Sequence, residues 1–365
     1  MTARYIVIVS PSYGGAEKRF FDIYTGLRRR AGDIHYVAPS TLLDRLKKDH
    51  PERSDVFAGL VPVHLPRWSA RGFLRAYRRV LRSLPRESVF HYPMQCLWPL
   101  HFGRGDSLSL SFVDCTMVPR LLTGHRNALL AYVASFFAQK IDILSPMVFD
   151  ALEGTAARRK AALTPGGTFL IPPATIEAGK PPVVAFFGRL IREKGIEDLL
   201  DIVPTVWQAL QARAPNGFKF VLAGYGPLER FTAAGAKALR ARGVPIEYVG
   251  YQTAEAIVRT SSIVLSLQRS TNYPSRVVAE ALTAGCGVIV RRSGDSTEFG
   301  ELPGLIYCAD PLDAADLADG IDALLERMES PSFCREIHVG AVQRFCNAQY
   351  LEYFDSMMSG RASKK

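Results

Sequence analysis

Residues 267–290 combine, in one short stretch, groups that suit the binding of a phosphorylated ligand. They indicate a loop, a helix and a buried parallel strand; Pro274 and Ser275 open the helix, and Asn272 or Ser275 would cap it. The helix N-terminus offers unpaired N–H groups and the positive end of the helix dipole, which together bind anions. Glu280 lies about one and a half turns further into the helix. At that depth a carboxylate suits a diol, while the helix N-terminus binds a phosphate attached to that diol.

Two cations flank another turn from strand to helix. Arg189 and Lys194 lie between a predicted strand at 183–187 and a predicted helix at 196–212, which Pro204 is expected to kink or split. Arginine presents a planar fork and lysine a point charge, so the pair suits a diphosphate. Taken singly, each residue is also compatible with an ordinary surface charge.

Two glycines occupy the first turn of the chain. Gly14 and Gly15 separate a predicted strand at 5–9 from a predicted helix at 16–30. This is where a phosphate meets a helix N-terminus in a parallel sheet, although a plain turn explains the glycines as well. The pattern is not GxGxxG, so it gives little support for dinucleotide binding.

Two further candidates follow predicted strands. Gly250 comes after a strand at 246–249, and Asp114 ends a strand at 107–113. Both positions would lie at the edge of an open α/β sheet where ligands bind. For Asp114, a capping or turn role is the alternative.

The order of the predicted elements indicates the fold class. Strands alternate with helices in both halves of the chain, which predicts α/β domains with parallel sheets. A length of 365 residues favours two domains over a single core. The proline-rich residues 171–182 resemble an interdomain linker.

Composition limits the classes of partner and the cellular location. A net charge of +10 fits nucleic acid, an anionic membrane surface or phosphorylated small molecules. The six cysteines form no CxxC pair and no zinc pattern, so they are expected to be reduced and mostly buried. The apolar runs at 6–9 and 128–138 are too short for a signal peptide and a membrane span, respectively. The expected location is the cytoplasm, with any membrane contact peripheral, at the inner face.

Residues 68–86 predict a basic amphipathic helix with Phe73, Leu74, Tyr77, Leu81 and Leu84 on one face and six arginines elsewhere. Such a helix either faces the core with a solvated arginine face or lies on anionic lipid. No recognition motif or stacking aromatics accompany the charge, so no nucleic-acid partner is expected.

Seven motifs in order resemble the retaining glycosyltransferases of family 4. They are PSYGGAEK, FVDCT, FFGRLIREKGIEDLL, VLAGYGPLE, EYVGYQ, NYPSRVVAEALTAGCGVIV and FCNAQYLEYF. The resemblance implies two Rossmann-like domains facing a central cleft, the GT-B fold. It places an acceptor-binding domain at 1–178 and a nucleotide-sugar-binding domain at 179–335. Terminal helices at 336–360 would cross back to pack on the first domain.

The resemblance also implies roles for the residues of the first loops. Gly14 and Gly15 would let the backbone approach the donor diphosphate. Arg189 and Lys194 would neutralise that diphosphate in place of a metal ion, and Gly250 would border the base.

The resemblance assigns the remaining roles to the loop and helix at 267–290. Glu280 would bind the ribose hydroxyls, and the N–H groups near Ser275, Arg276 and Val277 would bind phosphate or sugar oxygens. The chain has no Asp-x-Asp pair to hold a divalent ion, so neither a metal nor a cofactor is expected beyond the donor substrate.

Two positions depart from the family pattern. Asn272 stands where the family usually has a glutamate, and an asparagine cannot act as a base or stabilise a cation by charge. Val113 precedes Asp114 where the family often has histidine, which leaves Asp114 as the best catalytic candidate in that crevice. These departures put the donor sugar, and the rate, in question.

The implied reaction transfers a sugar, of hexose type, from a nucleotide diphosphate to a hydroxyl of a glycan or lipid-linked acceptor, with retention of configuration. Bacterial surface polysaccharide or glycolipid synthesis is the expected setting. The alternatives are a non-catalytic family member that binds a nucleotide sugar or a partner enzyme, and a nucleotide-sugar epimerase on the same fold.

Overall fold

The computed structural model describes residues 2–10, 15–65, 70–93, 96–112, 126–165, 182–211, 218–270 and 273–359. The chain divides into two compact units, which are described separately below. The first unit comprises Met1–Leu170 together with Asn347–Lys365, and the second comprises Ile171–Cys346.

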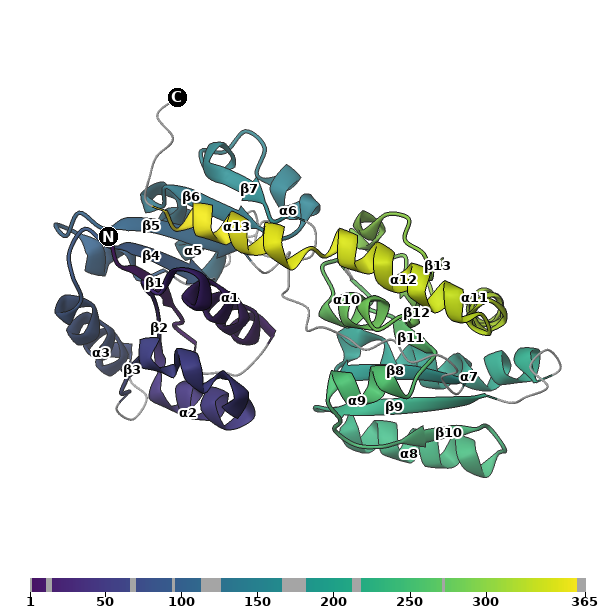
Figure 1. The fold of residues 1–365 in the computed structure, drawn as a ribbon. Coiled ribbons are helices and arrows are strands. Elements are labelled where there is room, and N and C mark those ends of the chain that lie inside the picture. Colours follow the sequence, from purple (N-terminus) through teal and green to yellow (C-terminus); the bar gives the residue numbers. More distant parts are fainter. Residues whose placement is uncertain are drawn as a thin grey trace. The chain divides into compact units, whose positions relative to one another are not determined.

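The described strands of the first unit form one seven-stranded parallel sheet (Figure 1). In spatial order they are β3 (Leu60–Val63), β2 (Ile34–Pro39), β1 (Arg4–Val7), β4 (Val89–Pro93), β5 (Ser107–Phe112), β6 (Lys140–Ile143) and β7 (Ala161–Leu163). The α-helices are α1 (Gly15–Ala31), α2 (Ser40–Asp49), α3 (Ala70–Ser83), α5 (Arg126–Phe137), α6 (Pro146–Ala151) and α13 (Asn347–Met357). The short 3₁₀ segments are η1 (Pro51–Gly59), η2 (Trp98–His101) and η3 (Arg158–Lys160).

Helices cover both faces of this sheet. Along β1 and just beyond it, Tyr5 and Val7 face one core, while Ile6 and Ile8 face the other, as the two-residue period of a strand requires. Helices α3, α5 and α6 pack on the Tyr5 side, and α1, α2 and α13 pack on the Ile6 side. Because both faces are buried, Tyr5 to Val9 form a continuous apolar run instead of alternating with polar residues.

The described strands of the second unit form a six-stranded parallel sheet. In spatial order they are β10 (Ile246–Tyr248), β9 (Lys219–Tyr225), β8 (Val183–Arg189), β11 (Ile263–Ser266), β12 (Gly287–Arg291) and β13 (Leu305–Cys308). The α-helices are α7 (Ile196–Leu210), α8 (Glu229–Ala241), α9 (Ala254–Arg259), α10 (Arg276–Thr283), α11 (Ala314–Met328) and α12 (Pro331–Arg344). The 3₁₀ segments are η4 (Arg192–Lys194) and η5 (Ser296–Phe299).

Both sheets have the strand order of a doubly wound Rossmann domain. The chain steps outward from β1 to β3 on one side and from β4 to β7 on the other, and the second unit repeats this pattern from β8. The direction reverses between β1 and β4 and between β8 and β11, and a reversal of this kind marks the ligand crevice of such a sheet. The predicted fold class of two Rossmann-like domains is confirmed.

Two details differ from the sequence-based expectations. Helix α7 continues through Pro204, so the predicted split does not occur. Buried Val203 and Val206 beside the proline pack this helix onto the core, and that burial offsets the one backbone hydrogen bond that proline removes. Strand β7 was not predicted from the sequence.

The terminal helices also divide differently from the prediction for residues 336–360. Helix α12 belongs to the second unit, and the change of unit falls at Cys346 and Asn347. Only α13 packs on the first unit, where Tyr350, Leu351 and Phe354 join the core on the Ile6 side of the sheet.

Among the residues described, Cys286, Cys308 and Cys334 are buried free thiols, and Cys96 and Cys346 are free and partly buried. Burial raises the pKa of Cys96 and of Cys308 to about 12, which keeps both thiols protonated and unreactive. Over the same described part of the chain, no helix has both the length and the apolarity needed to cross a bilayer.

Candidate functional site

The second unit gathers its candidate residues at the carboxyl edge of its sheet. Because all six strands are parallel, the segments that follow them meet at this edge: Arg189 ends β8, Gly250 follows β10 and Gln268 follows β11. Strands β8 and β11 are neighbours at the point where the strand order reverses. The structure therefore brings the two-cation turn and the loop before α10 together.

A glycine lets these two segments pack closely. Gly195 has a φ of +79°, and a side chain there would clash with the carbonyl oxygen of Leu267. A hydrogen bond of 2.9 Å from the N–H of Arg269 to the carbonyl of Glu193 adds a second link between the segments. Backbone contacts thus hold the η4 segment against the loop that leads to α10.

Lys194 lies half-buried between these segments, and its Nζ donates a hydrogen bond to Oε1 of Gln268. Burial, and then repulsion by the nearby Arg189, lower the pKa of Lys194 to about 8. The side chain of Arg189 is exposed and makes no hydrogen bond or ion pair with the described residues. Arg189 and Lys194, the two residues predicted to bind a diphosphate, are therefore close enough for their charges to repel. A bound anion would relieve that repulsion.

The N-terminus of α10 lies on the same loop. Ser275 occupies the N-cap position and is buried, but its side chain makes no capping hydrogen bond, contrary to the sequence-based expectation. Arg276 is the first helical residue, where the positive end of the helix dipole disfavours a cation unless an anion is near. A bond of 2.6 Å joins its Nε to Oε1 of Glu280, one turn further along. Val277 follows Arg276 in the first turn and is half-buried.

In this structure the carboxylate of Glu280 is engaged by Arg276, so a ribose would have to share it or displace the arginine. The ribose role of Glu280, and the phosphate roles of Ser275, Arg276 and Val277, remain predictions.

Gly250 occupies the expected turn for a conformational reason. Its φ is +72°, which disfavours any side chain, and nothing lies within 4 Å of the position that a Cβ would take. Its carbonyl accepts a 2.8 Å hydrogen bond from the N–H of Gly224, which holds the turn after β10 to the end of β9.

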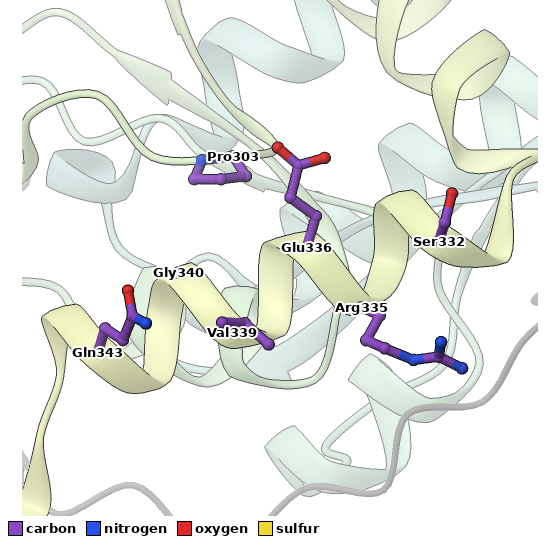
Figure 2. A pocket seen from close by; sticks show the side chains of 7 residues that line it. All are labelled: Pro303, Ser332, Arg335, Glu336, Val339, Gly340 and Gln343. Carbon is purple, nitrogen blue, oxygen red and sulfur yellow. The ribbon is translucent and has the colours of Figure 1, made fainter.

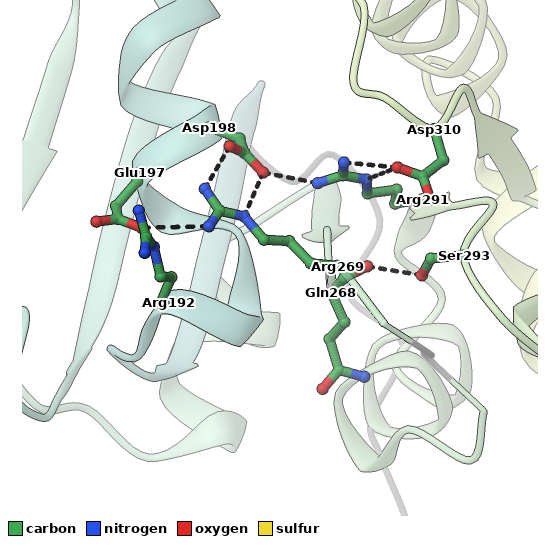
Figure 3. A network of polar contacts seen from close by, with 8 residues as sticks. All are labelled: Arg192, Glu197, Asp198, Gln268, Arg269, Arg291, Ser293 and Asp310. Carbon is green, nitrogen blue, oxygen red and sulfur yellow. Dashed lines mark hydrogen bonds and ion pairs between the residues drawn. The ribbon is translucent and has the colours of Figure 1, made fainter. Parts of the chain in front are cut away.

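An ion-pair network behind the two loops was not predicted (Figure 3). Asp198, in the first turn of α7, accepts two bonds of 2.8 and 2.5 Å from Arg269 and one of 2.6 Å from Arg291. Arg291 also donates to Asp310, with Nε 2.8 Å from Oδ1. Hydrogen bonds from Arg269 and Arg291 hold the pKa of Asp198 below its usual value.

This network joins the carboxyl ends of β11, β12 and β13 to α7. The sequence did contain a usable signal, because Arg269 and Arg291 both stand at or just after the ends of strongly apolar strands.

Three of the predicted site residues lie outside the described residues: Gly14, Asp114 and Asn272. Gly15 is the first residue of α1, which follows β1 as predicted. The roles proposed for these four residues remain predictions.

A buried cluster in the first unit resembles a catalytic triad in composition only. His91 lies 3.0 Å from the Oγ of Ser111, which in turn donates a 2.6 Å hydrogen bond to Asp142. His91, Ser111 and Asp142 are completely buried, so no substrate could reach them. Burial also lowers the pKa of His91 to about 4, which keeps the imidazole neutral. Their role is to satisfy buried polar groups inside the sheet.

A shallow groove of about 450 Å³ lies elsewhere on the second unit (Figure 2). It is lined by Pro303, Ser332, Arg335, Glu336, Val339, Gly340 and Gln343, mostly from α12. Pro303 precedes β13, so the groove borders the amino edge of the sheet. It is therefore separate from the candidate site at the carboxyl edge. Within the described ranges, no cluster of three potential metal ligands occurs.

Comparison with known proteins agrees with this geometry. Residues 181–327 match the family model described as glycosyl transferases group 1. No curated protein sequence matches the chain.

Solved structures share the architecture at low sequence identity. HepE from Anabaena, in complex with UDP and glucose, is 14% identical with a TM-score of 0.74, over 98% of this chain and 100% of that one. Sucrose-phosphate synthase from Thermosynechococcus elongatus is 17% identical with a TM-score of 0.68, over 97% and 98%. WaaG, a glycosyltransferase involved in lipopolysaccharide biosynthesis, is 13% identical with a TM-score of 0.63, over 98% and 99%. Residues 181–327 therefore match the group 1 glycosyltransferase family model, and the chain shares the GT-B fold of these solved structures.

Proposed function

We propose that this chain is a glycosyltransferase that moves a sugar from a nucleoside diphosphate to a hydroxyl of a glycan or lipid-linked acceptor, with retention of anomeric configuration. The observation that carries the proposal is the pair Arg189 and Lys194 at the carboxyl edge of the second sheet, beside the loop that leads to the N-terminus of α10. HepE, with the same architecture, binds UDP and glucose, which makes a UDP-sugar the first donor to test.

The two cations would act on the leaving group. Cleavage of the bond between the sugar and the diphosphate leaves the diphosphate with additional negative charge. Arg189 would receive this charge through its guanidinium fork and Lys194 through its ammonium group. Because the charge develops during the reaction, binding it lowers the barrier more than it stabilises the bound donor. This arrangement would do without a divalent ion. Retention is proposed from the resemblance of the sequence motifs to the retaining enzymes of family 4.

Donor conversion tests the proposal directly. The purified chain is incubated with UDP- and GDP-sugars, with and without a panel of glycan and lipid-linked acceptors, and nucleotide release and products are measured. We expect acceptor-dependent release of one nucleotide and a product that retains the anomeric configuration. Nucleotide binding without turnover would instead favour a non-catalytic role, and donor conversion without acceptor would favour an epimerase.

For the acceptor, we propose a precursor of a bacterial surface polysaccharide or glycolipid, presented at the inner face of the membrane. Helix α3 exposes a row of arginines, while Tyr77 and Leu81 point into the core. Leu74 was placed on the apolar face of this helix but is 48% exposed, so the outer face combines cations with an apolar side chain. The structural likeness to WaaG, which acts in lipopolysaccharide biosynthesis, is in keeping with this class of acceptor.

A second feature of the first unit supports membrane contact. Phe102, Phe136 and Phe137 are 62%, 52% and 40% exposed, and Trp98 stacks on Phe137 with ring centroids 4.2 Å apart. The loop that carries Phe102 is attached to the end of α3, because Arg104 donates hydrogen bonds to the carbonyls that follow that helix. Exposed aromatic rings beside arginines suit the headgroup region of an anionic bilayer.

Co-sedimentation with liposomes tests this contact. We expect binding that requires anionic lipid and weakens as salt rises, and we expect Arg75→Ala with Arg79→Ala to reduce it. The matched control replaces two exposed basic residues on the other side of the first sheet, Lys47 and Lys48, with alanine. Equal pelleting with neutral liposomes, or equal losses in both double variants, would contradict a specific electrostatic contact through α3.

A further inference from the structure

Gln268 occupies a defined position in the wall of the candidate site. Its backbone carbonyl accepts a 2.6 Å hydrogen bond from Oγ of Ser293, beyond β12. The next residue, Arg269, is tied through its N–H to Glu193 and through its guanidinium to Asp198. The backbone around Gln268 is therefore fixed from two sides. Its side chain can hold a partner in one place.

The partner of that side chain is Lys194, whose Nζ donates to Oε1 of Gln268. A buried or half-buried lysine usually pairs with a carboxylate, and several carboxylates are near this edge of the sheet. In the structure four of them are bound by arginines. The pairs are Glu197 with Arg192 and Arg269, Asp198 with Arg269 and Arg291, Asp310 with Arg291, and Glu280 with Arg276.

The charged group that acts on Lys194 is Arg189, which repels it. In this site the arginines thus form ion pairs with these carboxylates, whereas the lysine is hydrogen-bonded to a neutral amide. Nothing in the described part of the chain neutralises Lys194.

We infer that Gln268 is a positioning residue, whose neutral amide oxygen aims the Lys194 ammonium at the donor diphosphate without cancelling its charge. This inference rests on the proposed function, because it takes the diphosphate to be the ligand of Lys194. A carboxylate at the same position would hold the lysine equally well but would compete with the phosphate oxygens and repel them.

The lowered pKa of Lys194 gives this inference a measurable signature. An anion binds the protonated lysine, and above pH 8 the neutral form predominates in the free protein. Affinity for a nucleoside diphosphate should therefore fall as pH rises from about 7 to about 9, a range in which the phosphate groups are already ionised. Gln268→Glu gives the lysine a carboxylate partner, so its pKa rises and the fall in affinity moves to higher pH.

Isothermal titration calorimetry with UDP and with GDP, at a series of pH values, makes the test. At pH 7 we expect Gln268→Glu to weaken binding by about tenfold or more, in line with loss of a charge-assisted contact. Gln268→Met, which is similar in length and neutral, should weaken binding less. The pH at which its affinity falls should be equal to or lower than that of the native chain. Lys194→Met should remove the inflection. Lys237→Met, which changes an exposed lysine on α8, should behave like the native chain.

The outcomes separate the inference from the function on which it rests. Unchanged affinity and an unchanged inflection in Gln268→Glu would overturn the role of Gln268. Native affinity in Lys194→Met, or no binding of either nucleotide by the native chain, would overturn the proposed donor site as well. Thermal unfolding of each variant shows whether it is folded, and a shifted pH inflection cannot arise from a general loss of stability.

Discussion

At the scale of single residues, the ability of the candidate site to bind an anion depends on which positive charges have no carboxylate partner. Lys194 and Arg189 approach one another without a carboxylate between them, whereas Asp198 and Glu280 are satisfied by arginines. Bringing like charges together costs free energy during folding. Such an arrangement is common at sites whose ligand supplies the missing charge.

Replacing Arg189 tests this view at one residue. Arg189→Ala should weaken binding of a nucleoside diphosphate by about 1.5–3 kcal/mol, the range for a hydrogen bond to a charged group. The unfolding free energy should hardly change, because the side chain is exposed and makes no described contact. Calorimetry and thermal unfolding measure the two quantities.

The control for that variant is Arg242→Ala. Arg242 is also exposed, but it follows α8 and precedes β10, at the amino edge of the same sheet. It should leave nucleotide affinity unchanged. If Arg189→Ala and Arg242→Ala bind the nucleotide equally well, Arg189 is not part of the site.

At the scale of elements, the Asp198 network connects α7 to the ends of three strands (Figure 3). The Arg269 and Arg291 side chains hold the loops that contain Gln268 and Ser293. Ser293 donates a hydrogen bond to the carbonyl of Gln268, and the side chain of Gln268 accepts one from Lys194. The network therefore acts on the ligand only through the placement of the loops.

Asp198→Asn should consequently affect both stability and donor binding. Asparagine offers the arginines one acceptor oxygen in place of two and removes the charge, so we expect a loss of about 1–2 kcal/mol in unfolding free energy at neutral pH. The sign of the pH dependence follows from the lowered pKa of Asp198. Its contribution is present above about pH 4, the unfolded value, and is lost as pH falls through the lower folded value.

Chemical denaturation at neutral pH and at low pH checks this expectation. The native chain and Asp198→Asn should differ at neutral pH and converge in acid. Asp55→Asn is the matched control, because Asp55 forms an exposed ion pair with Arg29 and should contribute little to the unfolding free energy. A difference for Asp198→Asn that persists unchanged in acid would show that the effect does not come from its charge.

At the scale of the whole molecule, the chain returns to its first unit after completing the second. Helix α13 is held there by apolar packing and by a buried polar network around Arg19. Arg19 donates a 2.6 Å hydrogen bond to the hydroxyl of Tyr350 and forms an ion pair of 3.3 Å with Asp142. Tyr353 donates to the same carboxylate at 2.9 Å.

Removing one member of this network should destabilise the first unit strongly. Arg19→Met leaves Asp142 buried without its cation, which typically costs about 3–5 kcal/mol. Arg29→Met removes one partner of an exposed pair and should cost about 1 kcal/mol or less. Denaturant unfolding that follows a first-unit signal measures both. Equal, small effects would show that α13 is held by its apolar residues alone.

Much of the fold could be predicted because parallel strands buried on both faces leave a plain apolar signature. Apolar runs such as 183–187 and 287–290 could be recognised as buried strands directly, and each was followed by a glycine or polar turn. The same reasoning found Arg189, Lys194 and Gly250, because a residue that follows a strand in a parallel sheet must lie at its carboxyl edge. It did not find β7 or the path of α7 through Pro204, where local rules of propensity are overridden by packing.

By itself, the sequence determined the α/β class, the presence of two Rossmann-like domains and the residues that face the ligand edge, since each depends on neighbours along the chain. The tertiary structure alone decided which of those residues are paired. Asp198 meets Arg269 and Arg291, and Lys194 meets Gln268, because β8, β11 and β12 are adjacent in space although they are distant in sequence. Charge pairing depends on distances of a few ångströms between side chains, and those distances are set only when the sheet has formed.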